Sequence, residues 1–183
     1  AQAFDPDEAI ERARGVNNRL NDVVQGRPDR FAAFASLPTR NPDACPDELE
    51  RCVKELGFKG AMLHGLTDGK FHDLPEFWPI FAKAEELDVP IYIHPGRPHP
   101  AVIEAYYKEY AEKYRSILSA GWGFTVETAT AGVRLVLSGV LDKHPDVKII
   151  LGHMGEGLPF LLWRINHSFR KLSRPEGQDV AFR

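Results

Sequence analysis

Two apolar stretches decide the fold of this chain: PIYIH at residues 90–94 and VKIILGH at residues 147–153. Each is short and apolar on both faces, which is typical of a strand buried inside a parallel sheet. Between them, residues 125–141 carry apolar side chains at three- and four-residue steps, the spacing of a helix with one buried face. The order strand, helix, strand predicts a parallel sheet covered by helices.

The same alternation extends outward from these stretches. Residues 30–37 and 60–64 are predicted strands, residues 9–20, 47–56 and 75–88 are predicted helices, and a last helix begins near Pro159. Four strands are about half of the eight in a (β/α)8 barrel, which usually takes about 250 residues. No glycine-rich phosphate loop follows a strand, which disfavours a dinucleotide-binding sheet. We therefore expect α/β architecture: residues 1–183 form a single incomplete TIM-type barrel domain, its central part, with the first-strand and last-strand elements missing.

Composition excludes several classes of function. The 183 residues carry 23 basic and 26 acidic side chains and a net charge of -3, so no electrostatic footprint for nucleic acid is expected. No apolar run approaches the roughly 20 residues of a membrane span, and the first residues lack the pattern of a signal peptide. Cys45 and Cys52 are interpreted as reduced structural thiols, which favours a cytoplasmic protein.

Two predicted strands end in histidine. His94 and His153 fall at the carboxyl ends of their strands, where parallel α/β folds build their sites, and imidazole can bind a metal or move protons there. Glu156 follows His153 by three positions and can meet its ring. Arg164 lies in the next helix, from which a guanidinium can reach back to bind a carboxylate. For each residue a structural role is the alternative.

Several segments carry a family resemblance. The motifs LGFKGAMLHG, IYIHPG, GWGFTVET and LGHMGEGLPFLLWRINH occur in this order between Arg30 and about Phe169. Together they resemble the amidohydrolase-related, metal-dependent decarboxylase family, which includes gamma-resorcylate, 5-carboxyvanillate and aminocarboxymuconate-semialdehyde decarboxylases. The resemblance implies a divalent metal, zinc or manganese, and a small carboxylic acid as substrate.

The resemblance also assigns roles to residues. The family's first strand carries an E-x-H or H-x-H pair and its last strand an aspartate, and neither element occurs in this sequence. We therefore expect this chain by itself to hold the metal weakly or not at all. By resemblance, the candidate site residues are His153 and Glu156 for catalysis, His94 for the metal, and Arg164 and Trp122 for the substrate. His64 stands where the nearest relatives usually have asparagine, and it is a further candidate to bind the substrate at the mouth of the site.

These observations favour nonoxidative decarboxylation of a small aromatic or unsaturated acid. A metal-dependent hydrolase that acts on a lactone or a C–N bond is the first alternative, since the same two histidines would serve it. A non-catalytic half-barrel that acts as an interaction module is the second. We expect a homo-oligomer with no nucleic-acid or membrane partner, and structural roles for His72, His99, His144 and His167.

Overall fold

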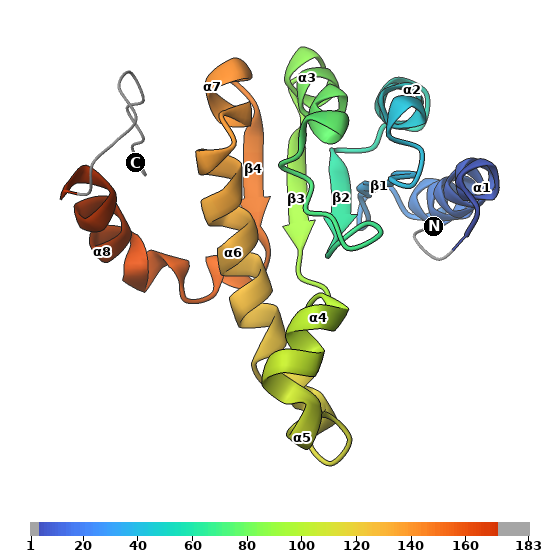
Figure 1. The fold of residues 1–183 in the computed structure, drawn as a ribbon. Coiled ribbons are helices and arrows are strands. Elements are labelled where there is room, and N and C mark those ends of the chain that lie inside the picture. Colours follow the sequence, from blue (N-terminus) through green and yellow to red (C-terminus); the bar gives the residue numbers. More distant parts are fainter. Residues whose placement is uncertain (1–3, 172–183) are drawn as a thin grey trace.

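The chain folds around a four-stranded, all-parallel sheet in the order β1-β2-β3-β4 (Figure 1). The computed structural model describes residues 4–171. The register places His64 beside His94, so neighbouring strands end at one edge of the sheet. The strands are β1 (Ala35–Ser36), β2 (Ala61–His64), β3 (Pro90–His94) and β4 (Lys148–Leu151). The helices are α1 (Pro6–Gly26), α2 (Cys45–Lys54), α3 (Trp78–Glu86), α4 (Pro100–Val102), α5 (Lys108–Ala111), α6 (Gly123–Leu137), α7 (Val140–Lys143) and α8 (Leu158–Lys171).

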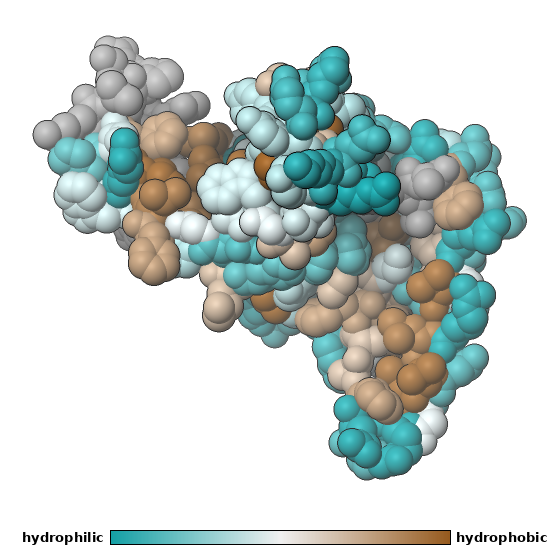
Figure 2. Space-filling view, turned by 90° about the horizontal axis from the view of Figure 1, so that it is seen from below, coloured by the Kyte–Doolittle hydropathy of each residue, from teal (hydrophilic) through white to brown (hydrophobic). Residues whose placement is uncertain are grey.

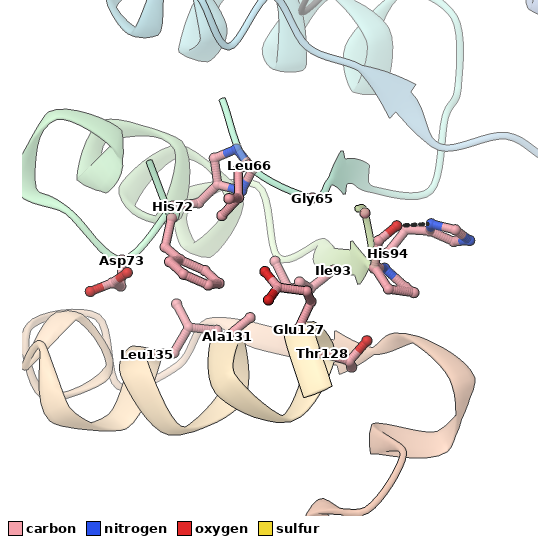
Figure 3. Close-up of a pocket in the computed structure, with 13 residues that line it drawn as sticks. Gly65, Leu66, His72, Asp73, Ile93, His94, Glu127, Thr128, Ala131 and Leu135 are labelled. Atoms are coloured by element: carbon pink, nitrogen blue, oxygen red, sulfur yellow. Dashed lines mark hydrogen bonds between the residues drawn. The ribbon is translucent and has the colours of Figure 1, made fainter. Parts of the chain in front are cut away.

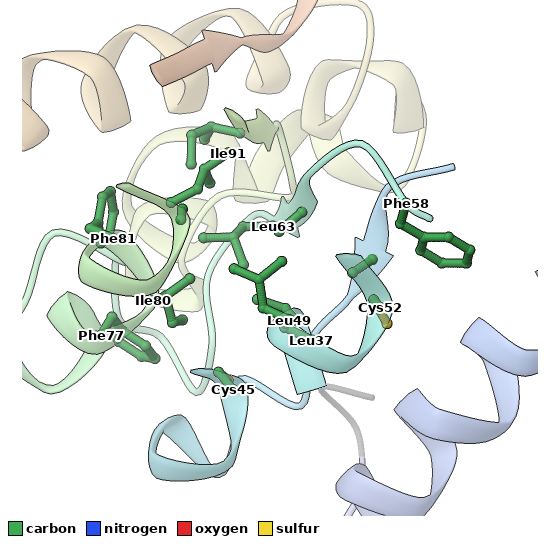
Figure 4. Packing of buried hydrophobic residues seen from close by; sticks show 14 of the residues in the cluster. Leu37, Cys45, Leu49, Cys52, Phe58, Leu63, Phe77, Ile80, Phe81 and Ile91 are labelled. Carbon is green, nitrogen blue, oxygen red and sulfur yellow. The ribbon is translucent and has the colours of Figure 1, made fainter. Parts of the chain in front are cut away.

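The hydrophobic core lies on one face of the sheet, beneath α2, α3, α6 and α7. Alternate strand residues such as Leu63 and Ile91 point into it, because successive side chains of a strand face opposite sides. Leu49 from α2 and Phe81 from α3 fill the space above them (Figure 4). Each apolar strand therefore has a covered outer face, as the sequence predicted.

The other face of the sheet lacks such a cover. Met62, Tyr92 and Ile150 are neighbours in the register and point to this face, where Ile150 is 40% exposed. No strand among residues 4–171 pairs with the outer edge of β4. Four strands with one covered face form part of a barrel, and the prediction that this chain holds the central part of a TIM-type barrel is confirmed.

Helix α1 covers the opposite edge of the sheet through one side chain. Asn17 is fully buried, and its amide nitrogen donates to the Ser36 carbonyl at 2.9 Å while its amide oxygen accepts from the Ser36 N–H at 2.9 Å. The side chain thus satisfies the backbone groups that an edge strand leaves unpaired. The strand predicted at residues 30–37 is shortened to Ala35–Ser36, and a side chain takes the place of a neighbouring strand at its outer edge.

Two predicted helices differ from the prediction at a proline and a glycine. The helix predicted over residues 75–88 starts as a 3-10 turn at Pro75–Phe77 and becomes α-helical only in α3, where Pro79 occupies the first turn and its missing N–H is harmless. The helix predicted over residues 125–141 is divided into α6 and α7 by Gly139, whose φ of +82° is a conformation that favours glycine.

Helix α8 stands away from the sheet at one end of the molecule (Figure 1). Phe160 is 94% exposed and Trp163 is 75% exposed, and brown side chains gather at this end in Figure 2. Within residues 4–171, no helix combines the length and the apolar character needed to cross a membrane.

The two cysteines are buried and unbridged, in agreement with their interpretation as structural thiols. Burial, followed by nearby acidic groups, raises the pKa of Cys45 to about 12 and that of Cys52 to about 12. Both thiols are therefore protonated, and so weakly nucleophilic, at neutral pH.

Candidate active site

Three histidine rings form a row at the carboxyl ends of the strands. The ring centroids of His64 and His94 are 4.6 Å apart, and those of His94 and His153 are 5.2 Å apart. Partial desolvation of the ring, followed by the neighbouring His94, lowers the pKa of His64. The row places the rings of His94 and His153 side by side, as their predicted positions at the carboxyl ends of strands led us to expect.

Glu156 holds the ring of His153, as the three-residue spacing predicted. The Nδ1 atom of His153 lies 2.8 Å from Oε1 of Glu156. A carboxylate accepts this bond, so Nδ1 carries the proton and Nε2 keeps a lone pair that can accept or relay a proton. The second carboxylate oxygen of Glu156 accepts a hydrogen bond from the Thr125 hydroxyl at 3.0 Å.

The turn that carries these residues has an unusual backbone. His153, Met154 and Glu156 have φ values of 52°, 59° and 53°, in the left-handed region that non-glycine residues seldom adopt. Such conformations cost of order 1–3 kcal/mol each and cluster at functional sites. Here the turn directs His153 back toward His94.

His94 is oriented by a hydrogen bond to the backbone carbonyl of the next residue. Its Nδ1 atom lies 2.7 Å from the carbonyl oxygen of Pro95, and Figure 3 draws this bond. A carbonyl can only accept, so Nδ1 is the protonated nitrogen and Nε2 has its lone pair available. This is the arrangement usual for a metal-binding histidine.

A small pocket lies behind His94, between β3 and α6 (Figure 3). Glu127 lines it, and burial raises the pKa of its carboxyl group. Thr128 also lines it; this residue is 1% exposed, and its hydroxyl has no hydrogen-bond partner among the described residues. Glu127 belongs to the motif GWGFTVET, and the structure places it in this pocket.

Two aromatic rings that sequence reasoning missed contact the histidine row. The Phe124 ring lies 6.2 Å from that of His94 and 6.0 Å from that of His153, between centroids. The Tyr92 ring stacks beside His94 at 6.3 Å. The strand period offered a signal for Tyr92, two residues before His94, but Phe124 is placed only by the packing of α6.

Two predicted substrate-binding residues lie outside this row. Trp122 is 52% exposed at the start of α6. Arg164 is exposed on α8, which stands away from the sheet (Figure 1). No described contact joins either residue to the three histidines, and their roles stay predictions.

The metal-ligand set is incomplete among the described residues. Within residues 4–171, no group of three or more histidine, cysteine, aspartate or glutamate side chains converges in a way that could hold a metal ion. A catalytic metal normally takes about three protein ligands. His94 therefore fits as one member of a larger set.

The other four histidines do not join the row, as expected. His99 accepts from the Ala101 N–H, and His144 pairs with Glu85 at 3.1 Å at the end of α7. The ring of His167 stacks on Trp163. His72 is buried beside the Thr67 hydroxyl at 2.9 Å.

His72 is expected to make stability fall in acid. Burial lowers the pKa of His72 from 6.5 to about 4, although Asp73 acts in the opposite direction. Between these two pH values, the unfolded chain therefore binds a proton at His72 that the folded chain does not bind. The free energy of unfolding should decrease as pH falls from about 6.5 to about 4, by up to about 3 kcal/mol. Urea unfolding across this range measures the slope. His72→Gln should flatten it and exposed His99→Asn should not, so equal slopes in all three proteins would contradict the assignment.

The fold and the site define a class of protein. A parallel α/β sheet with histidines at the carboxyl ends of neighbouring strands is typical of a (β/α)8 barrel whose site lies at the barrel mouth. The chain belongs to the amidohydrolase family, whose family model (Amidohydro_2) matches residues 1–173. The family resemblance found in the motifs is thereby confirmed.

Several curated relatives of this chain are named as decarboxylases. The chain is 46% identical over 166 residues to a gamma-resorcylate decarboxylase of Rhizobium sp. (strain MTP-10005), covering 87% of this chain and 49% of the relative. It is 31% identical to a 2-amino-3-carboxymuconate-6-semialdehyde decarboxylase of Dictyostelium discoideum, covering 93% of this chain and 45% of the relative. The chain spans about half the length of the curated relatives it matches.

Solved structures agree with this result. The crystal structure of a 2,6-dihydroxybenzoate decarboxylase from Rhizobium matches with a TM-score of 0.86 and 43% identity, covering 99% of this chain and 57% of the other. A dihydroxybenzoic acid decarboxylase from Polaromonas sp. JS666, solved with bound manganese and the inhibitor 2-nitroresorcinol, matches with a TM-score of 0.86 and 40% identity. This match covers 98% of the present chain and 54% of the Polaromonas chain.

Proposed function

We propose that the full-length protein is a metal-dependent, nonoxidative decarboxylase of a small hydroxylated aromatic acid. The observation that carries the proposal is the hydrogen-bonded pair of His153 and Glu156 beside His94, in a chain 46% identical to a gamma-resorcylate decarboxylase. The net reaction adds a proton to the ring carbon that bears the carboxylate. The carbon–carbon bond then breaks, carbon dioxide leaves, and the bonding electrons restore the aromatic ring.

His153 serves this reaction by holding or relaying a proton. Its Nδ1–H is committed to Glu156, so the free Nε2 atom is the one that can exchange a proton toward the substrate. Glu156 raises the basicity of the ring and stabilises its protonated form. The family resemblance implies that the direct donor to the ring carbon is an aspartate that lies outside this sequence.

His94 is proposed as one ligand of a divalent cation. Its Nε2 lone pair is available because Nδ1 is bound to the Pro95 carbonyl, and residues 4–171 do not supply the remaining ligands. When bound, such a cation acts as a Lewis acid toward a substrate carboxylate or phenolic oxygen. Manganese in the Polaromonas relative supports this metal for the present protein, with zinc as the other candidate.

The substrate residues follow from position and chemistry. His64 lies beside His94 and can line the mouth of the site. Arg164 offers a bidentate fork for a carboxylate, and Trp122 an aromatic surface, once α8 and the start of α6 meet the rest of the barrel. We also propose a homo-oligomer in the cytoplasm, the latter supported by two buried, unbridged thiols.

The hydrolase alternative would use the same histidines. The curated relatives named above are decarboxylases, which favours decarboxylation for this chain. No described contact specifically favours hydrolysis.

An assay with and without a chelator tests the proposed function. The purified full-length protein is incubated with 2,6-dihydroxybenzoate, a compound with which one relative was crystallised as a complex, and the release of carbon dioxide is followed. We expect release that EDTA abolishes and added Mn²⁺ restores. Turnover that survives complete metal removal, or hydrolysis of lactones without any decarboxylation of dihydroxybenzoates, would contradict the proposal.

A further inference from the structure

Thr125, a residue outside the histidine row, is hydrogen-bonded to the carboxylate of Glu156, which is in turn hydrogen-bonded to His153. We propose that Thr125 is a positioning residue: its hydroxyl fixes the Glu156 carboxylate, which in turn fixes the ring and the tautomer of His153. The proposal rests on the decarboxylase function given above, and it adds a residue that neither the motifs nor the relatives' names assign.

The hydrogen bonds form a directed chain. The Thr125 hydroxyl donates to Oε2 of Glu156 at 3.0 Å, and Nδ1–H of His153 donates to Oε1 of the same carboxylate at 2.8 Å. Each carboxylate oxygen therefore has a different partner. With both oxygens engaged, the carboxylate cannot rotate about its terminal bond without breaking one of the two hydrogen bonds.

The turn that carries His153 and Glu156 needs an external anchor. Glu156 has φ 53° and ψ -124°, and the neighbouring Met154 is 92% exposed. Gly155 and Gly157 flank Glu156 and leave the backbone conformationally free. Glu156 donates its backbone N–H within the turn, to the His153 carbonyl, so that bond does not tie the turn to the rest of the fold.

Helix α6 is a rigid anchor for that turn. Leu135 on α6 is buried in the core. Gly132 lies so close to β4 and α8 that an added Cβ would meet side-chain atoms of Leu158 at 2.8 Å and Leu151 at 2.9 Å. This close approach sets the distance between α6 and the end of β4, and so carries the Thr125 hydroxyl to Glu156.

The same helical turn also confines the imidazole. Phe124, next to Thr125, places its ring near those of both His94 and His153. One residue thus restricts where the His153 ring can lie, and the next determines which nitrogen is protonated. The structure gives the two functions to neighbouring positions on α6.

Steady-state kinetics of the full-length protein on 2,6-dihydroxybenzoate provide the first test. Thr125→Val keeps the shape and removes the hydroxyl, so kcat should fall about tenfold with little change in KM, since residues that orient a site histidine typically contribute that much. Thr125→Ser should restore most of kcat. Thr130→Val, the same change farther along α6, is the matched control and should keep the wild-type kcat.

The outcomes separate this proposal from the proposed function. An inactive wild-type protein would overturn the decarboxylase assignment, and an active wild type with an unchanged kcat in Thr125→Val would overturn the positioning role alone. An equal loss in Thr125→Ser and Thr125→Val would also overturn it, because the hydroxyl would then not be the active feature.

Nitrogen-15 NMR of the histidine side chains gives a readout that does not depend on turnover. The wild-type protein should show His153 as the Nδ1-protonated tautomer, and Thr125→Val should shift the population toward the Nε2-protonated form. Thr125→Ser and Thr130→Val should keep the wild-type signal. An unchanged His153 signal in Thr125→Val would contradict the proposal.

Discussion

Replacing His153 with asparagine is expected to lower kcat for decarboxylation by about 10²- to 10⁴-fold, the usual contribution of a positioned acid–base group. The amide nitrogen of asparagine can still donate a hydrogen bond to Glu156, but the amide does not exchange a proton near neutral pH. Glu156→Gln leaves the imidazole in place and removes only the charge that orients it, so a smaller loss, about 10- to 100-fold, is expected.

Pre-steady-state and steady-state rates on 2,6-dihydroxybenzoate measure this effect. His144→Asn is a suitable control, because His144 directly follows α7 and precedes β4, and so lies at the opposite end of the strand from His153. If a His153→Asn protein kept more than a tenth of the wild-type kcat, His153 would not act as an acid–base group in the reaction. A Glu156→Gln protein less active than His153→Asn would contradict the proposal that His153 contributes more to kcat than Glu156.

Replacing His94 with alanine is expected to abolish both metal retention and activity. The substitution removes the proposed metal ligand, whose Nε2 is held in place by the bond from Nδ1 to the Pro95 carbonyl. A Lewis acid contributes several kcal/mol to such reactions, so kcat should fall about 10³-fold or more. Elemental analysis after dialysis measures the bound metal in parallel with kcat.

The His153→Asn protein is the internal control for this experiment. It should retain the metal while losing activity, whereas His94→Ala should lose both. If His94→Ala retained a full complement of manganese, the ligand assignment would be wrong, even if the variant were inactive.

The strands and the core were predictable because their signals are local. An apolar run such as PIYIH is typical of a strand in a parallel sheet, and the structure forms β3 over the predicted residues Pro90–His94. His94 ends β3 and His153 follows the end of β4 by two residues, so both positions follow from these runs. The contact of Glu156 with His153 was also predictable, because it spans only three residues.

Edges and helix junctions were less predictable, because they depend on the neighbours of an element. The strand expected at residues 30–37 is reduced to Ala35–Ser36, and at its outer edge the side chain of Asn17 binds the backbone where another strand could pair. A sequence pattern reports which face of a strand is apolar, but it does not report what lies beside the strand.

The amino-acid sequence by itself determined the parallel α/β sheet, the partial barrel and the two histidines at its strand ends, because burial and strand period act on neighbouring residues. Only the tertiary structure decided that Thr125 binds Glu156 and that Phe124 faces both rings. Thr125 and Glu156 are 31 residues apart, and they meet because Gly132 lets α6 approach β4 closely. A contact of that kind depends on the distance between two packed elements, and no periodicity within either element encodes it.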